Sequence, residues 1–129
     1  MLDHVGLAVS DIKKSRAFYD AALKPLDMAL IFEVGPEVTE SGGTWLGYGP
    51  GDKPILWVGD GLKPGEGSHV AFEAKSRALV DEFHAAALAA GGTDNGAPGL
   101  RPDYAPNYYA AFVLDPDGIN LEAVCHKPE

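Results

Sequence analysis

Two histidines and one glutamate are the residues of this sequence with the clearest potential for chemistry. His4 and His69 each stand near the start of a stretch of alternating residues, and Glu122 lies within an apolar stretch near the end of the chain. A carboxylate among apolar neighbours is costly unless it is paired or binds a cation. Two imidazoles and one carboxylate form a facial triad that binds Fe(II) and related ions and leaves coordination positions open. These three residues are therefore candidate ligands for a divalent Fe, Mn, Co, Ni or Zn ion.

The candidate ligands are far apart in the sequence, so only the fold can bring them together. Sliding the sequence along itself without gaps until His4 lies on His69 reveals an internal repeat over positions 4–23. The identical pairs are His4-Val5 on His69-Val70, Phe18 on Phe83, and Ala21-Ala22-Leu23 on Ala86-Ala87-Leu88. A repeat of this kind predicts two copies of one supersecondary unit.

Both halves of the sequence show the same order of expected elements. Alternating residues predict strands, Ser10-Asp11 and Gly91-Gly92 mark a helix start and a helix end, and residues 115–118 form a hairpin turn. The first half has a strand over 3–9, a helix from Ile12 to before Pro25, and strands near 28–34, 44–48 and 54–58. The second half has a strand over 68–74, a helix over 77–90, and strands near 93–95, 109–114 and 119–125. The prediction is one α+β domain over 1–129, built of two βαβββ modules at about 1–60 and about 68–126 with a linker at 61–67.

The alternation within the first strand of each module predicts which side chains face a cavity. The bulky side chains, such as Leu7 and Phe72, must pack against the helices. This leaves His4 and its neighbours on one concave face, and His69 with Glu73 on the other. Glu73 is therefore a candidate acid or base, and the alternative is a solvated carboxylate at the end of a strand.

The repeat also places an aromatic residue where a second carboxylate would belong. The separation from His69 to Glu122 equals the separation from His4 to Trp57. We therefore expect three protein ligands rather than four. Trp57 is then expected to form a wall of the cavity, with an ordinary core position as the alternative.

The segment 93–109 is rich in glycine and proline, and it also carries three tyrosines and an arginine. We expect an irregular loop that serves as a lid. Arg101 can clamp a substrate carboxylate or phosphate, and Tyr104, Tyr108 and Tyr109 can wall an aromatic or amphipathic ligand. The alternative is a packed surface loop or a dimer contact.

Composition excludes several classes of function. The net charge is −9, with 10 basic against 19 acidic residues, so the chain lacks the basic stripe that binds nucleic acid or an anionic membrane surface. No apolar run approaches the roughly 18 residues of a membrane span. The start Met-Leu-Asp-His does not resemble a signal peptide, and the single cysteine, Cys125, fits a reducing compartment. We expect a cytoplasmic protein.

Four sequence motifs resemble those of the vicinal oxygen chelate superfamily, which includes glyoxalase I, extradiol dioxygenases and bleomycin-resistance proteins. The motifs are His4-Val-Gly-Leu-Ala-Val-Ser-Asp, Ala17-Phe-Tyr, His69-Val-Ala-Phe and Asp115-Pro-Asp-Gly-Ile-Asn-Leu-Glu122. The resemblance implies that the modules form a half-barrel cup, that the chain is a homodimer, and that the metal ligands are His4, His69 and Glu122. The further ligand of glyoxalase I would fall near Trp57 and is missing, which argues against glyoxalase I itself.

The resemblance implies a metal-dependent glyoxalase- or dioxygenase-like enzyme acting on a small, oxygen-rich and anionic substrate chelated to a divalent metal. Arg101 and Tyr104 would orient that substrate. Dioxygenase chemistry, lyase chemistry and glutathione transfer all stay open. The alternative from another class is a non-catalytic drug- or metabolite-binding protein, similar to bleomycin-resistance proteins, with a degenerate metal site.

Overall fold

The computed structural model describes residues 3–39, 41–64 and 68–129 and contains two units of the same order. The first consists of β1 (Val5–Ala8), α1 (Ile12–Ala22), the short 3-10 helix η1 (Lys24–Leu26), β2 (Ala29–Val34), β3 (Trp45–Gly49) and β4 (Leu56–Gly59). The second consists of β5 (His69–Glu73), α2 (Arg77–Ala89), β6 (Thr93–Leu100), β7 (Tyr109–Leu114) and β8 (Asn120–Cys125). The α+β fold of two βαβββ modules is confirmed. Part of the expected linker, residues 65–67, lies outside the described residues.

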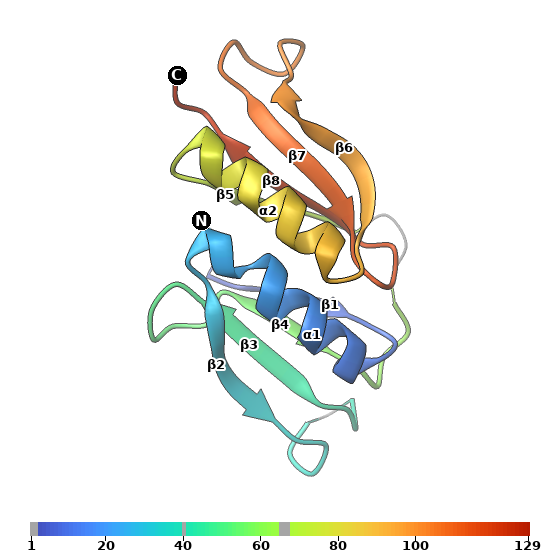
Figure 1. Cartoon of the computed structure of the whole chain (residues 1–129). Helices are drawn as coiled ribbons and strands as arrows, with labels where there is room; N and C mark the ends of the chain where they lie inside the picture. Colours follow the sequence, from blue (N-terminus) through green and yellow to red (C-terminus); the bar gives the residue numbers. More distant parts are fainter. Residues whose placement is uncertain (1–2, 40, 65–67) are drawn as a thin grey trace.

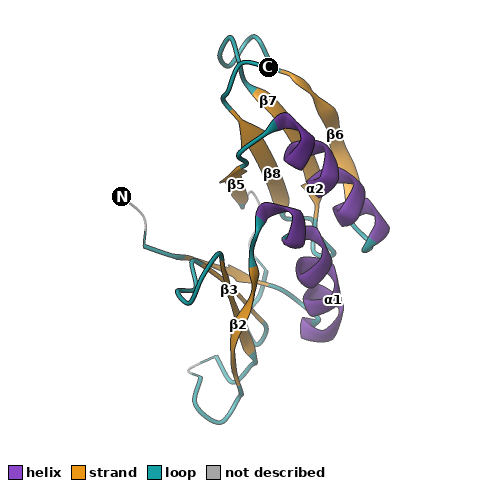
Figure 2. Ribbon diagram, turned by 60° about the vertical axis from the view of Figure 1, so that its left-hand side comes forward, coloured by secondary structure: helices purple, strands orange, loops and turns teal. Residues whose placement is uncertain are grey.

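Each module forms one four-stranded mixed sheet. The strand orders are β1-β4-β3-β2 and β5-β8-β7-β6. In each sheet the first pair is parallel and the other two pairs are antiparallel. Both helices lie side by side on the same side of the sheets (Figure 1, Figure 2). We call the opposite face of each sheet its open face.

The internal repeat is preserved in the strand register. Val5 pairs with Leu56 in the first sheet, and the residues that the repeat makes equivalent, Val70 and Leu121, pair in the second. Both helices also begin with a capping side chain at equivalent positions. Asp11 accepts hydrogen bonds from the backbone of Lys13 and Lys14, and Ser76 accepts one from Leu79. The two modules therefore share their strand register and the position of their helix caps.

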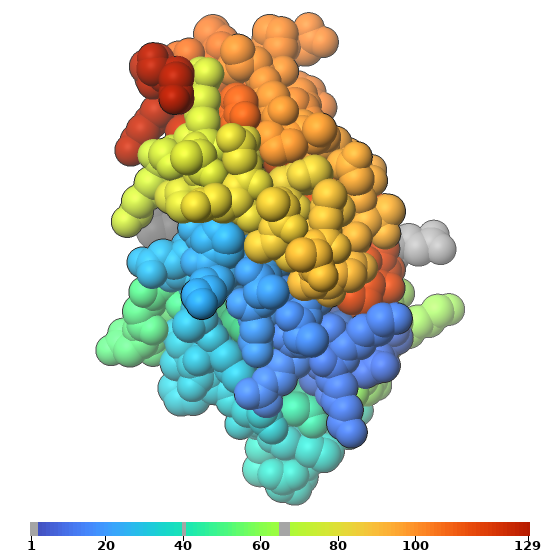
Figure 3. All heavy atoms as spheres, in the orientation of Figure 1, coloured from blue at the N-terminus to red at the C-terminus, as the bar shows by residue number. Residues whose placement is uncertain are grey.

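The core lies between the helices and the sheets. Phe18 and Phe83 are fully buried at equivalent positions of the two helices. Burying a side chain of this size contributes roughly 1.5–3 kcal/mol to folding. The space-filling view shows the two helices in direct contact over this core (Figure 3). No helix among the described residues is long and apolar enough to cross a membrane.

A buried polar contact joins the first helix to the hairpin between β7 and β8. The hydroxyl of Tyr19 donates to Asp115 Oδ2 at 2.9 Å, and Asp115 Oδ1 accepts from the backbone of Asp117 and Ile119 at 2.8 Å. Close by, the backbone N–H of Ser10 donates to Asp117 Oδ1 at 3.0 Å. Burial raises the pKa of Asp115, and it raises the pKa of Tyr19 well above its usual value. The hairpin of the second module thus holds the helix of the first.

The segment 93–109 is only partly the irregular loop that its composition suggests. Residues Thr93–Leu100 form β6, which pairs with β7 along the edge of the second sheet. Proline is tolerated at an edge or an irregularity of a sheet because no ladder hydrogen bond depends on it there. The register shifts between Gly96 and Gly99, on either side of Pro98. The strand expected near 93–95 therefore extends to Leu100, and the expectation of a loop was wrong for residues 96–100.

Candidate functional site

The clearest polar cluster lies on the open face of the second sheet. His69 on β5 and Glu122 on β8 belong to neighbouring parallel strands, where Glu122 pairs with Ala71. His69 Nε2 lies 3.0 Å from Glu122 Oε1. The other ring nitrogen, Nδ1, lies 3.2 Å from the carbonyl oxygen of Asn120.

The two contacts of the His69 ring bear on which of its nitrogens donates a hydrogen bond. If Nδ1–H donates to the carbonyl of Asn120, a neutral ring presents a lone pair on Nε2 to the carboxylate of Glu122. Two acceptors at this distance require a proton or a cation between them. Metal-binding histidines commonly donate their second N–H to a carbonyl in this way. The donor set of His69 and Glu122 therefore fits a divalent ion.

Glu122 is buried although it lies on the open face. Only 2 % of its surface is exposed. Its second oxygen, Oε2, accepts a hydrogen bond from the hydroxyl of Tyr108, which lies in the turn that follows β6. Desolvation and this hydrogen bond raise the pKa of Tyr108 to about 12. Both oxygens of the carboxylate are thus held in place.

Arg101 and Tyr104 lie beside this cluster but are not part of it. The guanidinium group of Arg101 donates to the carbonyls of Gly99 and Ala97 at 2.9 and 2.8 Å, and it lies over the ring of Phe112 at 5.4 Å. The main chain therefore orients Arg101 and uses two of its five N–H donors. Tyr104 is 65 % exposed and contacts the ring of Tyr108 edge-on at 5.2 Å.

Glu73 lies at the end of β5 and is exposed. It shares the open face with His69, as the strand alternation predicts. Within the part of the chain that the structure describes, its side chain makes no hydrogen bond or ion pair. Its role as an acid or base stays a prediction.

His4 is not brought together with the His69–Glu122 pair. Its Nδ1 lies 2.8 Å from Asp3 Oδ1, and 57 % of its side chain is exposed. Over residues 3–39, 41–64 and 68–129, no three His, Cys, Asp or Glu side chains are grouped as a metal site. His4 does line a hollow between the two sheets, and Ala71, the register partner of Glu122, lines it too. It thus lies on the side of the first module that faces the second.

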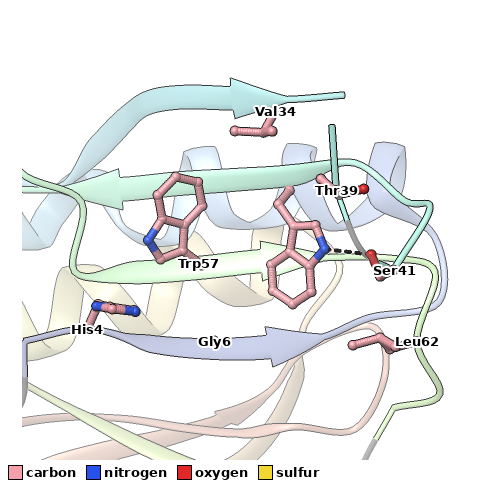
Figure 4. Close-up of a pocket in the computed structure, with 8 residues that line it drawn as sticks. His4, Gly6, Val34, Thr39, Ser41, Trp57 and Leu62 are labelled. Carbon is pink, nitrogen blue, oxygen red and sulfur yellow. Dashed lines mark hydrogen bonds between the residues drawn. The ribbon is translucent and has the colours of Figure 1, made fainter. Parts of the chain in front are cut away.

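A second hollow, of about 510 Å³, lies on the open face of the first sheet. His4, Gly6, Trp45 and Trp57 are among its lining residues, and Figure 4 shows His4 and Trp57 on this face. Trp57 thus lies in the lining of this hollow, and its role as a wall of a ligand-binding cavity stays a prediction. Trp45 was not singled out from the sequence, although a signal was present: Trp45-Leu-Gly47 and Trp57-Val-Gly59 both alternate tryptophan with glycine.

Comparison with known proteins identifies the family to which the fold belongs. Residues 1–123 match the family model described as the Glyoxalase/Bleomycin resistance protein/Dioxygenase superfamily. The chain belongs to this superfamily. The glyoxalase-like fold and the resemblance noted in the sequence are thereby confirmed. No protein of curated function matches the sequence.

Solved structures of the superfamily share the fold. A glyoxalase/bleomycin resistance protein from Albidiferax ferrireducens T118 is 32% identical, covers 99% of both chains and has a TM-score of 0.73. A glyoxalase I mutant from Zea mays is 25% identical with a TM-score of 0.74, and the match covers 95% of this chain and 46% of the maize chain. A family enzyme from Burkholderia phytofirmans PsJN, at 19% identity and a TM-score of 0.70 over 97% and 98% of the two chains, shows likeness of fold alone.

Proposed function

We propose that this glyoxalase-superfamily protein is a metal-dependent enzyme that acts on a small, oxygen-rich and anionic substrate. The observation that carries the proposal is the contact of 3.0 Å between His69 Nε2 and the buried carboxylate of Glu122. A divalent cation there would take the place of the proton that otherwise bridges the two groups, with one coordinate bond to each. His69 and Glu122 would supply two ligands to a divalent Fe, Mn, Ni, Co or Zn ion.

His4 is the proposed third ligand. It lines the hollow between the sheets, which is also lined by the register partner of Glu122. Its hydrogen bond to Asp3 is exposed to solvent, where such polar contacts contribute little free energy, so release of the ring is inexpensive. The site would then be completed within one chain.

A bound divalent ion supplies Lewis acidity to neighbouring substrate oxygens. The residues of the chain position the substrate and hold protons. The three remaining N–H donors of Arg101 would bind an anionic group, and the exposed ring of Tyr104 would cover it. The hydroxyl of Tyr108 keeps its proton and donates a hydrogen bond to Glu122, and Glu73 would exchange a proton with substrate at the solvent edge of the sheet.

The proposal includes a homodimer in the cytoplasm. The homodimer is what the family resemblance implies. The cytoplasmic location rests on the single cysteine, Cys125, which is buried and free. Small molecules are the expected partners, in place of nucleic acid or membranes.

Metal content tests the proposal directly. Protein purified without a metal-affinity tag is incubated with each ion, desalted and analysed by elemental mass spectrometry. We expect about one ion per chain in the wild type, and loss of most of it in Glu122→Gln and His69→Gln. His84→Gln is the matched control, because His84 bonds to Asp94 and takes no part in the proposed site. Absence of metal in the wild type under every condition would overturn the proposal.

A ligand-sequestering role is the second candidate function. The tryptophans on the open face of the first sheet favour it, because they offer apolar contact area to a ligand. This function predicts ligand binding that is indifferent to a chelator and to His69→Ala. The enzyme function predicts that substrate binding depends on both.

A further inference from the structure

Two tryptophans cover the open face of the first sheet. Trp45 on β3 and Trp57 on β4, which together form the tryptophan platform, are the only tryptophans of the sequence. Both are partly exposed and line the same hollow. Figure 4 shows the ring of Trp57 extending from β4 over β3. The phenyl ring of Phe32 continues the surface, at 6.4 Å and 14° from the Trp57 ring.

Glycines across the strands let both indole rings lie on the sheet. Trp45 pairs with Gly59, and Trp57 pairs with Gly47. A Cβ atom on Gly59 would meet the Trp45 ring at 1.9 Å, and one on Gly47 would meet the Trp57 ring at 2.9 Å. Any larger residue would therefore push the rings away from the backbone. Because these positions are glycines, each indole ring can lie against the strands and present its other side to the hollow.

The second module shows that the fold itself does not require this platform. Under the internal repeat, Trp45 and Trp57 correspond to Ala110 and Glu122, and Gly47 corresponds to Phe112. These residues pair in the same registers. One module thus carries an ionisable cluster, and the equivalent surface of the other is aromatic. The platform is a feature of the first module alone.

The polar groups around the platform decide which ligand fits it. The indole N–H of Trp45 donates to the hydroxyl of Ser41 at 2.9 Å, shown as a dashed line in Figure 4, so its ring face is the part left for a ligand. The described residues that line the hollow include no Asp, Glu, Lys or Arg. Among these described residues a cationic ligand finds no carboxylate, and a phosphate finds no basic group other than His4, whose ring is already bonded to Asp3. An uncharged flat ring needs neither.

We propose that the tryptophan platform is a binding site for a planar conjugated ring of a small molecule, which stacks on Trp45 and Trp57. Offset stacking on aromatic faces adds to the free energy of burial. The site uses ring faces only and needs no metal, so it extends beyond the proposed metal chemistry. His4 lines both this hollow and the hollow between the sheets, so the ring site adjoins the proposed metal site.

The test compares two neutral probes that differ in flatness: 2-naphthol and its saturated counterpart decahydro-2-naphthol. Titrations of the wild-type protein are followed by nitrogen–proton correlation spectra in the presence of a chelator. Each tryptophan gives one indole N–H signal, so the two signals report on the platform directly. We expect both signals to shift with 2-naphthol, and an affinity about tenfold weaker for the saturated probe. Equal affinities, or indole signals that do not move, would overturn the proposal.

Variants separate stacking from general apolar contact. Trp57→Phe keeps a ring and should stay within about threefold of the wild type, whereas Trp57→Leu should weaken 2-naphthol binding by about tenfold. Phe112→Leu, at the equivalent place in the second module, is the matched control and should leave binding unchanged. If Trp57→Leu does not fold, the wild-type probe comparison alone decides.

Two further measurements distinguish this proposal from others. Glu122→Gln should bind 2-naphthol as the wild type does, even though it is expected to lose metal. If Glu122→Gln still binds 2-naphthol while the wild type binds no metal, the proposed metal-dependent activity is excluded and the proposed ring-binding site is retained. Tetramethylammonium should not shift the indole signals, and preferential binding of this cation would overturn the assignment to a neutral ring.

Discussion

Trp57 on β4 pairs with Gly6 on β1 in the same parallel register in which Glu122 on β8 pairs with Ala71 on β5. Trp57 and Glu122 therefore occupy equivalent places in the two modules. One is a buried carboxylate bonded to His69, and the other is an aromatic ring above glycine. The equivalent surfaces of the two modules thus carry different groups: an aromatic ring in the first module and a carboxylate bonded to an imidazole in the second.

The origin of the third metal ligand can be tested by mixing two inactive variants. His4→Ala and Glu122→Ala are unfolded together, refolded and analysed for metal. If each site lies within one chain, as we propose, no chain in the mixture is complete and metal stays near the level of the single variants. If a dimer shares its sites, about a quarter of all sites would be complete and would recover metal, because half of the dimers are mixed and each has one intact site. That recovery would contradict a site within one chain.

The bond between Tyr108 and Glu122 predicts a change in alkaline titration. The pKa of Tyr108 is raised from 10.0 to about 12, so the folded state favours the neutral phenol. The stability that this provides is present below pH 10 and is lost as the pH rises toward 12. Glu122→Gln should lower this pKa, as measured by phenolate absorbance with Tyr108→Phe as the reference that lacks the signal. An unchanged titration in Glu122→Gln would show that burial alone causes the shift.

Removal of the buried carboxylate of Asp115 should destabilise the joint between the modules. Asp115→Ala leaves the Tyr19 hydroxyl and two backbone N–H groups without their acceptor, and a loss of about 3 kcal/mol in the free energy of unfolding is expected. Tyr19→Phe should cost about 1 kcal/mol. Chemical denaturation measures both, with the exposed Tyr104→Phe as a control near zero. Equal stability of Asp115→Ala and the wild type would exclude this contact as a structural joint.

A substitution at Gly59 should destabilise the protein through Trp45. In Gly59→Ala the added methyl group would collide with the indole ring, and we expect a loss of about 1–3 kcal/mol with a shift in tryptophan emission. Gly51→Ala is the matched control, since a Cβ atom there meets nothing within 4 Å. Its stability should stay within about 0.5 kcal/mol of the wild type. Equal effects of the two substitutions would contradict the placement of the Trp45 ring on Gly59.

Most of the fold could be predicted from the sequence because its signals are periodic. The alignment that places His4 on His69 also relates the strand pairs Val5–Leu56 and Val70–Leu121. Strand alternation likewise places bulky side chains toward the helices and polar ones on the open faces. These properties depend on the spacing of residues along single elements, which the sequence shows directly.

The details of the candidate site depend on contacts that spacing does not determine. The pair His69–Glu122 follows from two strands in register, and it was expected. The contact of His4 with Asp3 is a local hydrogen bond between adjacent residues, which periodicity does not reveal. The hydrogen bond from Tyr108 to Glu122 depends on the course of the turn after β6, in a segment whose proline content suggested no regular structure.

The bond between Tyr19 and Asp115 spans 96 positions of the sequence. A chain emerging from the ribosome therefore exposes the first helix well before the partner of its buried hydroxyl, 96 residues later, has been made. Long-range contacts of this kind delay folding, and domains acquire their native packing only when such partners are present. The first module would thus complete its packing after synthesis has passed the β7–β8 hairpin, so translation itself sets the earliest time at which the two halves can dock.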